Sequence, residues 1–171
     1  MRRSIQALLS CCFVAAFLLQ SGSAALEDSQ TSDEAAHLAA GYSYLVTGDY
    51  RMNPEHPPLS KLISAFPLLF SDASLPLDHP SWTQVNEWQF GGRFLYRNVL
   101  PPNVLLALGR APVLIMGVLL LLLMYKWAGA LYGGAAALLV LALAAFEPNL
   151  LAHSHYVTND MALGLSYGYL K

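Results

Sequence analysis

Hydrophobic residues in this chain gather in a few long runs that polar stretches separate. The first run extends from Ile5 to Leu19, the second from Asn103 to Tyr125, and the third from Ala128 to Phe146. A transmembrane helix needs about 20 mostly apolar residues. The pattern therefore predicts an all-α integral membrane protein with three transmembrane helices. A further apolar segment, Met161 to Lys171, predicts the start of a fourth.

Two interpretations fit the N-terminal segment, residues 1–25. Arg2 and Arg3 precede the apolar run and the small residues SGSAA follow it, as in a cleavable signal peptide. The segment also suits an uncleaved transmembrane anchor, because spans can be as short as roughly 17 residues. In both interpretations the two arginines stay in the cytoplasm and the chain after Ala25 is exported.

The long segment 26–102 is the most polar part of the chain and should form an external loop with short helices of its own. Ser32 is a suitable N-cap for a first helix, which Gly48 should end. Leu59 to Phe70 predicts a second short helix, amphipathic enough to lie in the bilayer interface. Between the two helices, a rigid turn is predicted by three prolines: Pro54, Pro57 and Pro58.

Alternation of the spans predicts which polar segments share a side of the membrane. Lys126 should lie on the cytoplasmic side. The C-terminal part, residues 103–171, should hold transmembrane helices and a second external loop near residues 147–160. Asp33, Glu55 and Asp160 would then all face the same, external side.

Composition supports a membrane protein and argues against a nucleic-acid-binding protein. Hydrophobic residues make up 56% of the chain and charged residues only 12%, against about 25% charged in a typical soluble domain. The net charge is −2 and no run of basic residues is present, so we expect no nucleic-acid partner. Cys11 and Cys12 are adjacent inside the first apolar run, where small apolar filler is the ordinary interpretation.

The adjacent carboxylates Asp33 and Glu34 are the first candidates for chemistry. Adjacent residues on a helix point about 100° apart, so the two acids cannot act as a facing pair. One can face a site while the other caps or pairs. Acids at the start of a helix are also stabilised by the helix dipole without any further role.

Three other polar groups stand out. Glu55 and His56 precede two prolines that fix the backbone, which lowers the entropy cost of presenting them to a ligand. Arg110 lies inside an apolar span, where a charge is a functional hypothesis by default, although its side chain can also reach toward the headgroups. It would bind an anion such as a lipid-linked phosphate. No strong metal-ligand spacing is present.

Several motifs together resemble glycosyltransferase family 39, the protein O-mannosyltransferases and their bacterial relatives. They are D-E at Asp33–Glu34, the H at His37, G-Y-x-Y at Gly41–Tyr44, G-D-Y at Gly48–Tyr50, and H-P-P-L-x-K at His56–Lys61. The form E-H-P-P at Glu55–Pro58 is also similar to the lipid A aminoarabinose transferase branch. Weaker matches follow in the family's order: Arg110, L-Y-G at Leu131–Gly133, F-x-P at Phe146–Pro148 and T-x-D at Thr158–Asp160.

The resemblance implies a type C glycosyltransferase fold and an enzyme that moves a sugar from a polyprenyl-phosphate donor to an acceptor hydroxyl on a lipid or protein. It implies that Asp33 is the catalytic base with support from Glu34, and that Asp160 is the acid of the second external loop. The residues near the donor phosphate would be Glu55, His56, Lys61 and Arg110. A divalent metal ion stays open, with Asp33, Glu55 and Asp160 as candidate ligands.

Such enzymes have about a dozen spans, so the sequence is interpreted as an N-terminal fragment that is inactive alone. We expect a multi-pass protein of the bacterial inner membrane, in contact with membrane lipids, whose long loop is periplasmic. The alternative is a non-catalytic membrane scaffold or assembly protein whose loop packs on a partner.

Overall fold

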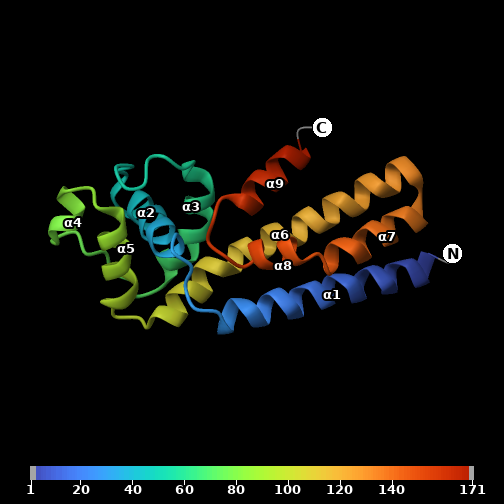
Figure 1. The fold of residues 1–171 in the computed structure, drawn as a ribbon, viewed down its shortest axis with the longest axis horizontal. Helices are drawn as coiled ribbons and strands as arrows, with labels where there is room; N and C mark the ends of the chain where they lie inside the picture. Colours follow the sequence, from blue (N-terminus) through green and yellow to red (C-terminus); the bar gives the residue numbers. More distant parts are fainter. Residues whose placement is uncertain (1–2, 170–171) are drawn as a thin grey trace. The chain divides into compact units, whose positions relative to one another are not determined.

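The computed structural model describes residues 3–169, and these residues form helices and no strand. The helices, coloured along the chain in Figure 1, are α1 (Arg3–Glu27), α2 (Glu34–Thr47), α3 (Pro58–Ala65), the 3-10 helix η1 (Phe66–Phe70), α4 (Pro80–Thr83), α5 (Glu87–Tyr96), α6 (Pro102–Tyr132), α7 (Gly134–Ala145), α8 (Pro148–His153) and α9 (Asp160–Tyr169). The all-α prediction is confirmed. Arg2 and Lys171, which belong to the predicted termini, lie outside the described residues.

Among residues 3–169, two helices are long and apolar enough to cross a membrane: residues 4–27 of α1, and α6. The first lies near the N-terminus, where a signal sequence has the same properties, so both interpretations of residues 1–25 remain. The chain is therefore described as a helical protein with two candidate membrane-spanning helices.

The predicted span from Ala128 to Phe146 is not formed. Residues 128–132 continue α6, so Lys126 lies inside that helix and not in a turn after it. Gly133 then breaks the chain with a φ of 84°, a left-handed conformation that glycine adopts easily. The helix that follows, α7, has 12 residues. At about 1.5 Å per residue it is roughly 18 Å long and cannot span a bilayer core of about 30 Å.

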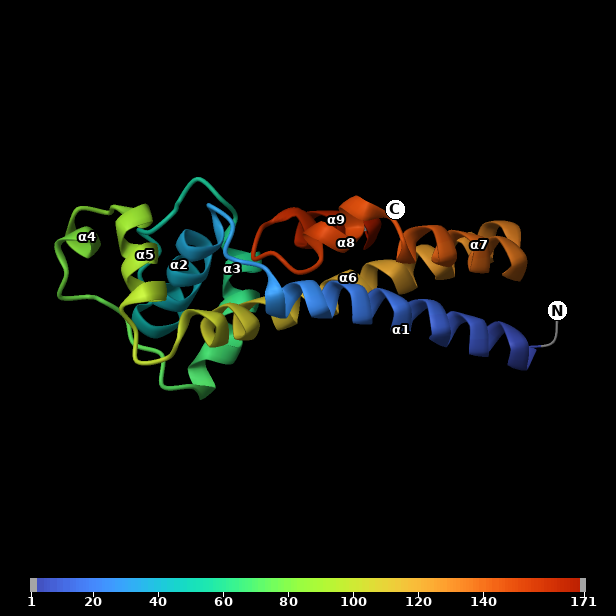
Figure 2. The ribbon, with the colours of Figure 1, turned by 60° about the horizontal axis from the view of Figure 1, so that its bottom comes forward.

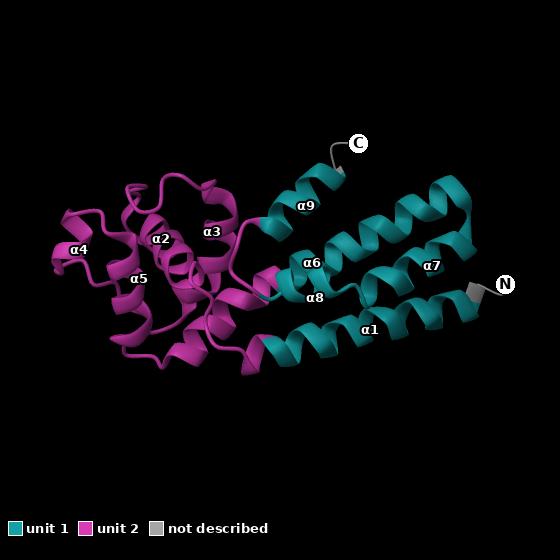
Figure 3. Ribbon diagram, in the orientation of Figure 1, with its two compact units in different colours: residues 1–24, 114–155, 160–171 teal, residues 25–113, 156–159 magenta. Residues whose placement is uncertain are grey.

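The chain divides into two compact units, coloured separately in Figure 3. The first unit holds residues 1–24, 114–155 and 160–171. Its core joins α1, α6 and α7 through Phe17, Leu121 and Leu141, all wholly buried. The turned view in Figure 2 also shows α8 close to α6, where the Ser154 side chain meets Gly117.

The second unit holds residues 25–113 and 156–159 and contains every candidate site residue except Asp160. Its centre is α2, which packs on α3 and α5 and is buried on nearly all sides from Glu34 to Tyr44. Small residues allow this close packing: a Cβ atom at Gly41 would lie 2.2 Å from the carbonyl oxygen of Lys61. As predicted, Gly48 ends α2, in a left-handed conformation.

Two local predictions for this unit need correction. The helix begins at Glu34 with Asp33 as its N-cap, one residue later than the predicted cap Ser32. The predicted helix from Leu59 to Phe70 is α3 followed by the 3-10 helix η1. The change occurs just before Pro67, which has no N–H for an α-helical hydrogen bond.

Candidate functional site

The adjacent acids at the start of α2 have different surroundings. Glu34 is wholly buried, whereas Asp33 is exposed. Asp33 occupies the N-cap position, but its side chain makes no capping hydrogen bond. Among residues 3–169 no side-chain hydrogen bond engages the Asp33 carboxylate. The geometry thus separates the two acids, one exposed at the surface and one engaged inside the protein.

Glu34 is fixed by four hydrogen bonds from three parts of the chain. Its Oε1 accepts from Arg110 Nε at 2.9 Å and from the Val157 amide at 3.0 Å. Its Oε2 accepts from Arg110 Nη2 at 2.7 Å and from the Thr31 amide at 2.9 Å. This carboxylate therefore joins α2 to α6 and to the segment before α9.

Arg110 has partners other than the phosphate we expected. Besides Glu34, its guanidinium donates to the carbonyl oxygens of Ala25 and Asp28, both at 2.9 Å, and of Ser29 at 3.1 Å. These five hydrogen bonds use all five N–H groups of an arginine. The side chain is only 1% exposed. In this conformation Arg110 supports the site from inside and has no donor left for a ligand.

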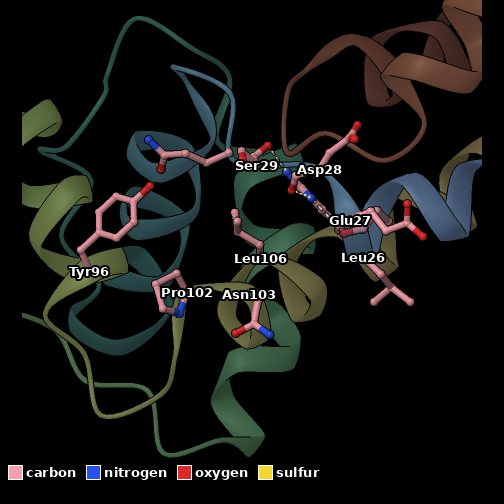
Figure 4. A pocket seen from close by; sticks show the side chains of 11 residues that line it. Leu26, Glu27, Asp28, Ser29, Tyr96, Pro102, Asn103 and Leu106 are labelled. Carbon is pink, nitrogen blue, oxygen red and sulfur yellow. Dashed lines mark hydrogen bonds between the residues drawn. The ribbon is translucent and has the colours of Figure 1, made fainter.

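A pocket of about 270 Å³ lies beside this arginine. Figure 4 shows the labelled residues 26–29 on one side of it and Tyr96 on the other, with the beginning of α6 (Pro102, Asn103 and Leu106) between them. Arg110 thus lines a cavity, but its N–H donors are turned to the protein.

Lys61, the last residue of the H-P-P-L-x-K motif, is buried in a polar network. Its Nζ donates to the Asn53 carbonyl oxygen at 2.6 Å, to Asn53 Oδ1 at 2.9 Å and to the Tyr44 hydroxyl at 3.1 Å. Burial lowers the pKa of Lys61 from its ordinary value. Burial, followed by the nearby Glu55, raises the pKa of Tyr44 to about 12. All three N–H groups of the Lys61 ammonium donate within the protein. Like Arg110, Lys61 therefore has no donor left for a ligand in this conformation.

Glu55 belongs to a carboxylate pair that the sequence did not reveal. The Asn53 amide donates to Glu55 at 3.2 Å and to Glu87 at 3.0 Å. Burial, and then the nearby Glu55 charge, raise the pKa of the Glu87 carboxyl, whereas a backbone hydrogen bond lowers the pKa of Glu55. The two carboxyls that share the Asn53 amide therefore have pKa values shifted in opposite directions.

His56 lies against a second histidine from α2. The ring centroids of His37 and His56 are 5.0 Å apart in an edge-on arrangement. His37 Nδ1 is 3.1 Å from the Val157 carbonyl oxygen. A carbonyl can only accept, so Nδ1 carries the proton. Burial lowers the pKa of His37. The nearby charges of His56 and Lys61 also lower this pKa, whereas the charge of Asp33 raises it.

Asp33 lies one turn before His37 in the chain, and the charges of Asp33, His56 and Lys61 all act on the His37 ring. The structure therefore brings Asp33 into the neighbourhood of the His56–Lys61 turn. Asp160 is in the other unit, where its Oδ2 lies 3.1 Å from His153 Nδ1. That Asp160 shares a site with Asp33 stays a prediction. Its neighbour Asn159 does belong to the second unit, and its side-chain oxygen accepts a hydrogen bond from the Ser60 hydroxyl in α3.

Three residues of this neighbourhood were missed as site candidates. Tyr44 appeared only within the G-Y-x-Y motif, and Asn53 was not considered. Glu87 carried no signal, because it reaches Glu55 from a different helix, α5. Asn53 has a φ of 51°, a left-handed conformation in which asparagine is enriched. An Asn-Pro step in a turn was the available clue.

Asp33, Glu55 and Asp160 are the candidate ligands for a metal ion. Among residues 3–169, no three His, Cys, Asp or Glu side chains gather closely enough to hold a metal ion. Asp33 and Glu55 belong to the second unit and Asp160 to the first, so a metal site shared by these three residues stays a prediction.

Comparison with known proteins adds no family. The chain matches no protein-family model, and no curated protein or solved structure is significantly similar to it.

Proposed function

We propose that this chain forms part of a membrane glycosyltransferase that transfers a sugar from a polyprenyl-phosphate donor to an acceptor hydroxyl. The observation that carries the proposal is the contact between His37 and His56, with ring centroids 5.0 Å apart. It brings the motif region at the start of α2 together with the motif region at His56–Lys61, and both resemble glycosyltransferase family 39. The two regions are close in sequence, because only the rest of α2 and the turn after it separate them. The exposed Asp33 lies at the same end of α2.

Asp33 is the proposed catalytic base. An acceptor hydroxyl would give its proton to this carboxylate while its oxygen forms a bond to the anomeric carbon. The bond from that carbon to the donor phosphate breaks, and the phosphate leaves with the electron pair. Exposure and the lack of a capping bond suit Asp33 to this role.

Glu34 and Arg110 are proposed as positioning residues. Their buried ion pair fixes the first turn of α2, on which Asp33 stands. His56 is exposed beside the buried Lys61 and is the proposed contact for the donor phosphate, with Lys61 supplying positive charge behind it. Glu55 stands at the same turn, with Asn53 holding its carboxylate.

The proposal places the protein in a bacterial inner membrane with segment 26–102 on the periplasmic side, with a lipid or protein as acceptor. To test it, membranes containing the complete reading frame are supplied with polyprenyl-phosphate carriers of radiolabelled hexoses and pentoses. The expected result is protein-dependent release of polyprenyl phosphate and label in an acceptor. Label no higher than in membranes lacking the protein, with every carrier, contradicts the proposal.

A second candidate function is a non-catalytic scaffold, and one surface favours it. The α3–η1 segment exposes large apolar side chains: Leu59, Ile63, Phe66, Leu69 and Phe70. Such a face suits the bilayer interface or a partner protein. Under this alternative, charge-removing changes at Asp33 leave cellular function intact, whereas Phe66→Ser with Phe70→Ser abolishes it.

A further inference from the structure

Segment 26–102 contains nine acidic residues and four basic ones, and the basic residues fall into two classes. Lys61 is buried and fully hydrogen-bonded. Arg51 pairs with Asp49 and lies over the Trp82 ring. Within residues 3–169, Arg93 and Arg97 form no side-chain hydrogen bond and no ion pair. An acidic segment thus leaves two guanidiniums without a partner.

Both unpaired arginines line one pocket of about 200 Å³. Arg93 stands in the last turn of α5, and Arg97 is the C-cap that follows it. The opposite wall is the loop Ser74, Leu75, Pro76 and Asp78. This wall is held to the end of α5, because Asn98 accepts from the Ser74 amide at 3.1 Å and donates to its carbonyl oxygen at 2.9 Å.

Charge in the pocket favours an anion. Two guanidiniums oppose one carboxylate, and no ion pair joins Asp78 to either arginine among the described residues. The helix dipole stabilises a cation at the C-terminal end of a helix, and this applies both to Arg93 in the last turn of α5 and to Arg97 at its C-cap. The dipole does not by itself explain why both side chains line one cavity.

The position in the chain indicates where the anion comes from. Five residues after Arg97 begins α6, a candidate membrane span. Tyr96 and Val99, which flank Arg97, are 57% and 76% exposed. Exposed aromatic and apolar side chains next to arginines at the end of a span are typical of the headgroup level. At that depth the abundant anions are lipid phosphates.

We propose that the pocket between Arg93, Arg97 and the loop 74–78 binds the phosphate group of an anionic phospholipid. Each guanidinium can donate paired hydrogen bonds to phosphate oxygens. The pocket would anchor the second unit at the membrane surface, beside the start of α6. This inference does not depend on the proposed enzymatic function.

The test measures binding of short-chain phosphatidylglycerol, short-chain phosphatidylcholine and inorganic phosphate to the full chain in neutral detergent, by titration calorimetry. We expect phosphatidylglycerol to bind more tightly than the other two. Arg93→Gln and Arg97→Gln should each weaken its binding about fivefold, because one basic residue near an anionic surface contributes about that factor. Asp78→Asn should strengthen binding, because it removes the opposing charge.

Arg51→Gln is the matched control, since it removes an arginine of the same segment outside the pocket. It should leave the affinity unchanged, and far-UV circular dichroism should show the same helix content in every variant. Equal losses in Arg51→Gln and Arg93→Gln would mean general electrostatic attraction and overturn the proposal. Binding of inorganic phosphate as tight as that of phosphatidylglycerol would overturn the lipid as ligand.

Discussion

Arg110 and Glu34 form a buried, two-point ion pair, with Nε to Oε1 at 2.9 Å and Nη2 to Oε2 at 2.7 Å. Their side chains are 1% and 0% exposed. Burying two charges costs solvation energy, which is regained only when every donor and acceptor is paired. Here the backbone carbonyls around the guanidinium and the amides around the carboxylate complete that pairing.

Removing either partner should destabilise the fold strongly. Arg110→Met leaves a buried carboxylate without its countercharge and three carbonyl groups without their donor. We expect a loss of about 3–5 kcal/mol in the free energy of unfolding. Glu34→Gln should act in the same direction. The measurement is equilibrium unfolding of the detergent-solubilised chain, followed by circular dichroism.

The exposed pair Asp49 and Arg51 supplies the control. Because water solvates both of these groups, Asp49→Asn should leave stability essentially unchanged. If Arg110→Met unfolds at the same denaturant concentration as the wild type, the ion pair does not hold the second unit together.

Two neighbouring glycines of α5 should respond in opposite ways to alanine. A Cβ atom at Gly91 would lie 2.6 Å from the carbonyl carbon and oxygen of Ala35 in α2, whereas nothing lies within 4 Å of a Cβ at Gly92. Gly91→Ala should cost about 1–3 kcal/mol through overpacking. Gly92→Ala should gain up to about 1 kcal/mol through helix propensity. Thermal unfolding of both variants gives the comparison, and equal shifts would refute the close approach of α2 and α5.

His37 should make stability depend on pH. Its pKa in the folded chain is below the ordinary 6.5 because of burial. As the pH falls below about 6.5, the unfolded chain takes up a proton that the folded chain resists, so stability falls until the folded pKa is passed. The unfolding temperature between pH 8 and pH 5 should therefore drop less in His37→Gln than in the wild type.

An identical pH profile for His37→Gln and wild type would show that His37 is not the responsible group.

Local signals in the sequence predicted much of the second unit. The helical spacing after Asp33 and the glycine at position 48 gave the bounds of α2 to within about two residues. The angle of about 100° between adjacent residues on a helix predicted different surroundings for Asp33 and Glu34. The structure places Asp33 at the surface and Glu34 inside. Such features depend on neighbouring residues, which is why a pattern can carry them.

Features that depend on distant partners could not be predicted. The sequence predicted that Arg110 binds a phosphate. It gave no sign of the partner Glu34, which lies in another helix and is linked to Arg110 by no spacing rule. Glu87 meets Glu55 in the same way, through the fold of α5 onto α2. The third span failed for a local reason: hydropathy does not register the break at Gly133, whose backbone conformation ends α6 and starts α7.

The most direct test of the proposed enzyme is sugar transfer by Asp33→Asn, assayed in the complete reading frame with its polyprenyl-phosphate donor. The matched control is Asp72→Asn, which changes another exposed acid of the same segment. Loss of a general base predicts a fall in transfer of about 10²–10⁴-fold for Asp33→Asn, with unchanged unfolding and a normal rate for Asp72→Asn. Wild-type transfer by Asp33→Asn would contradict the account.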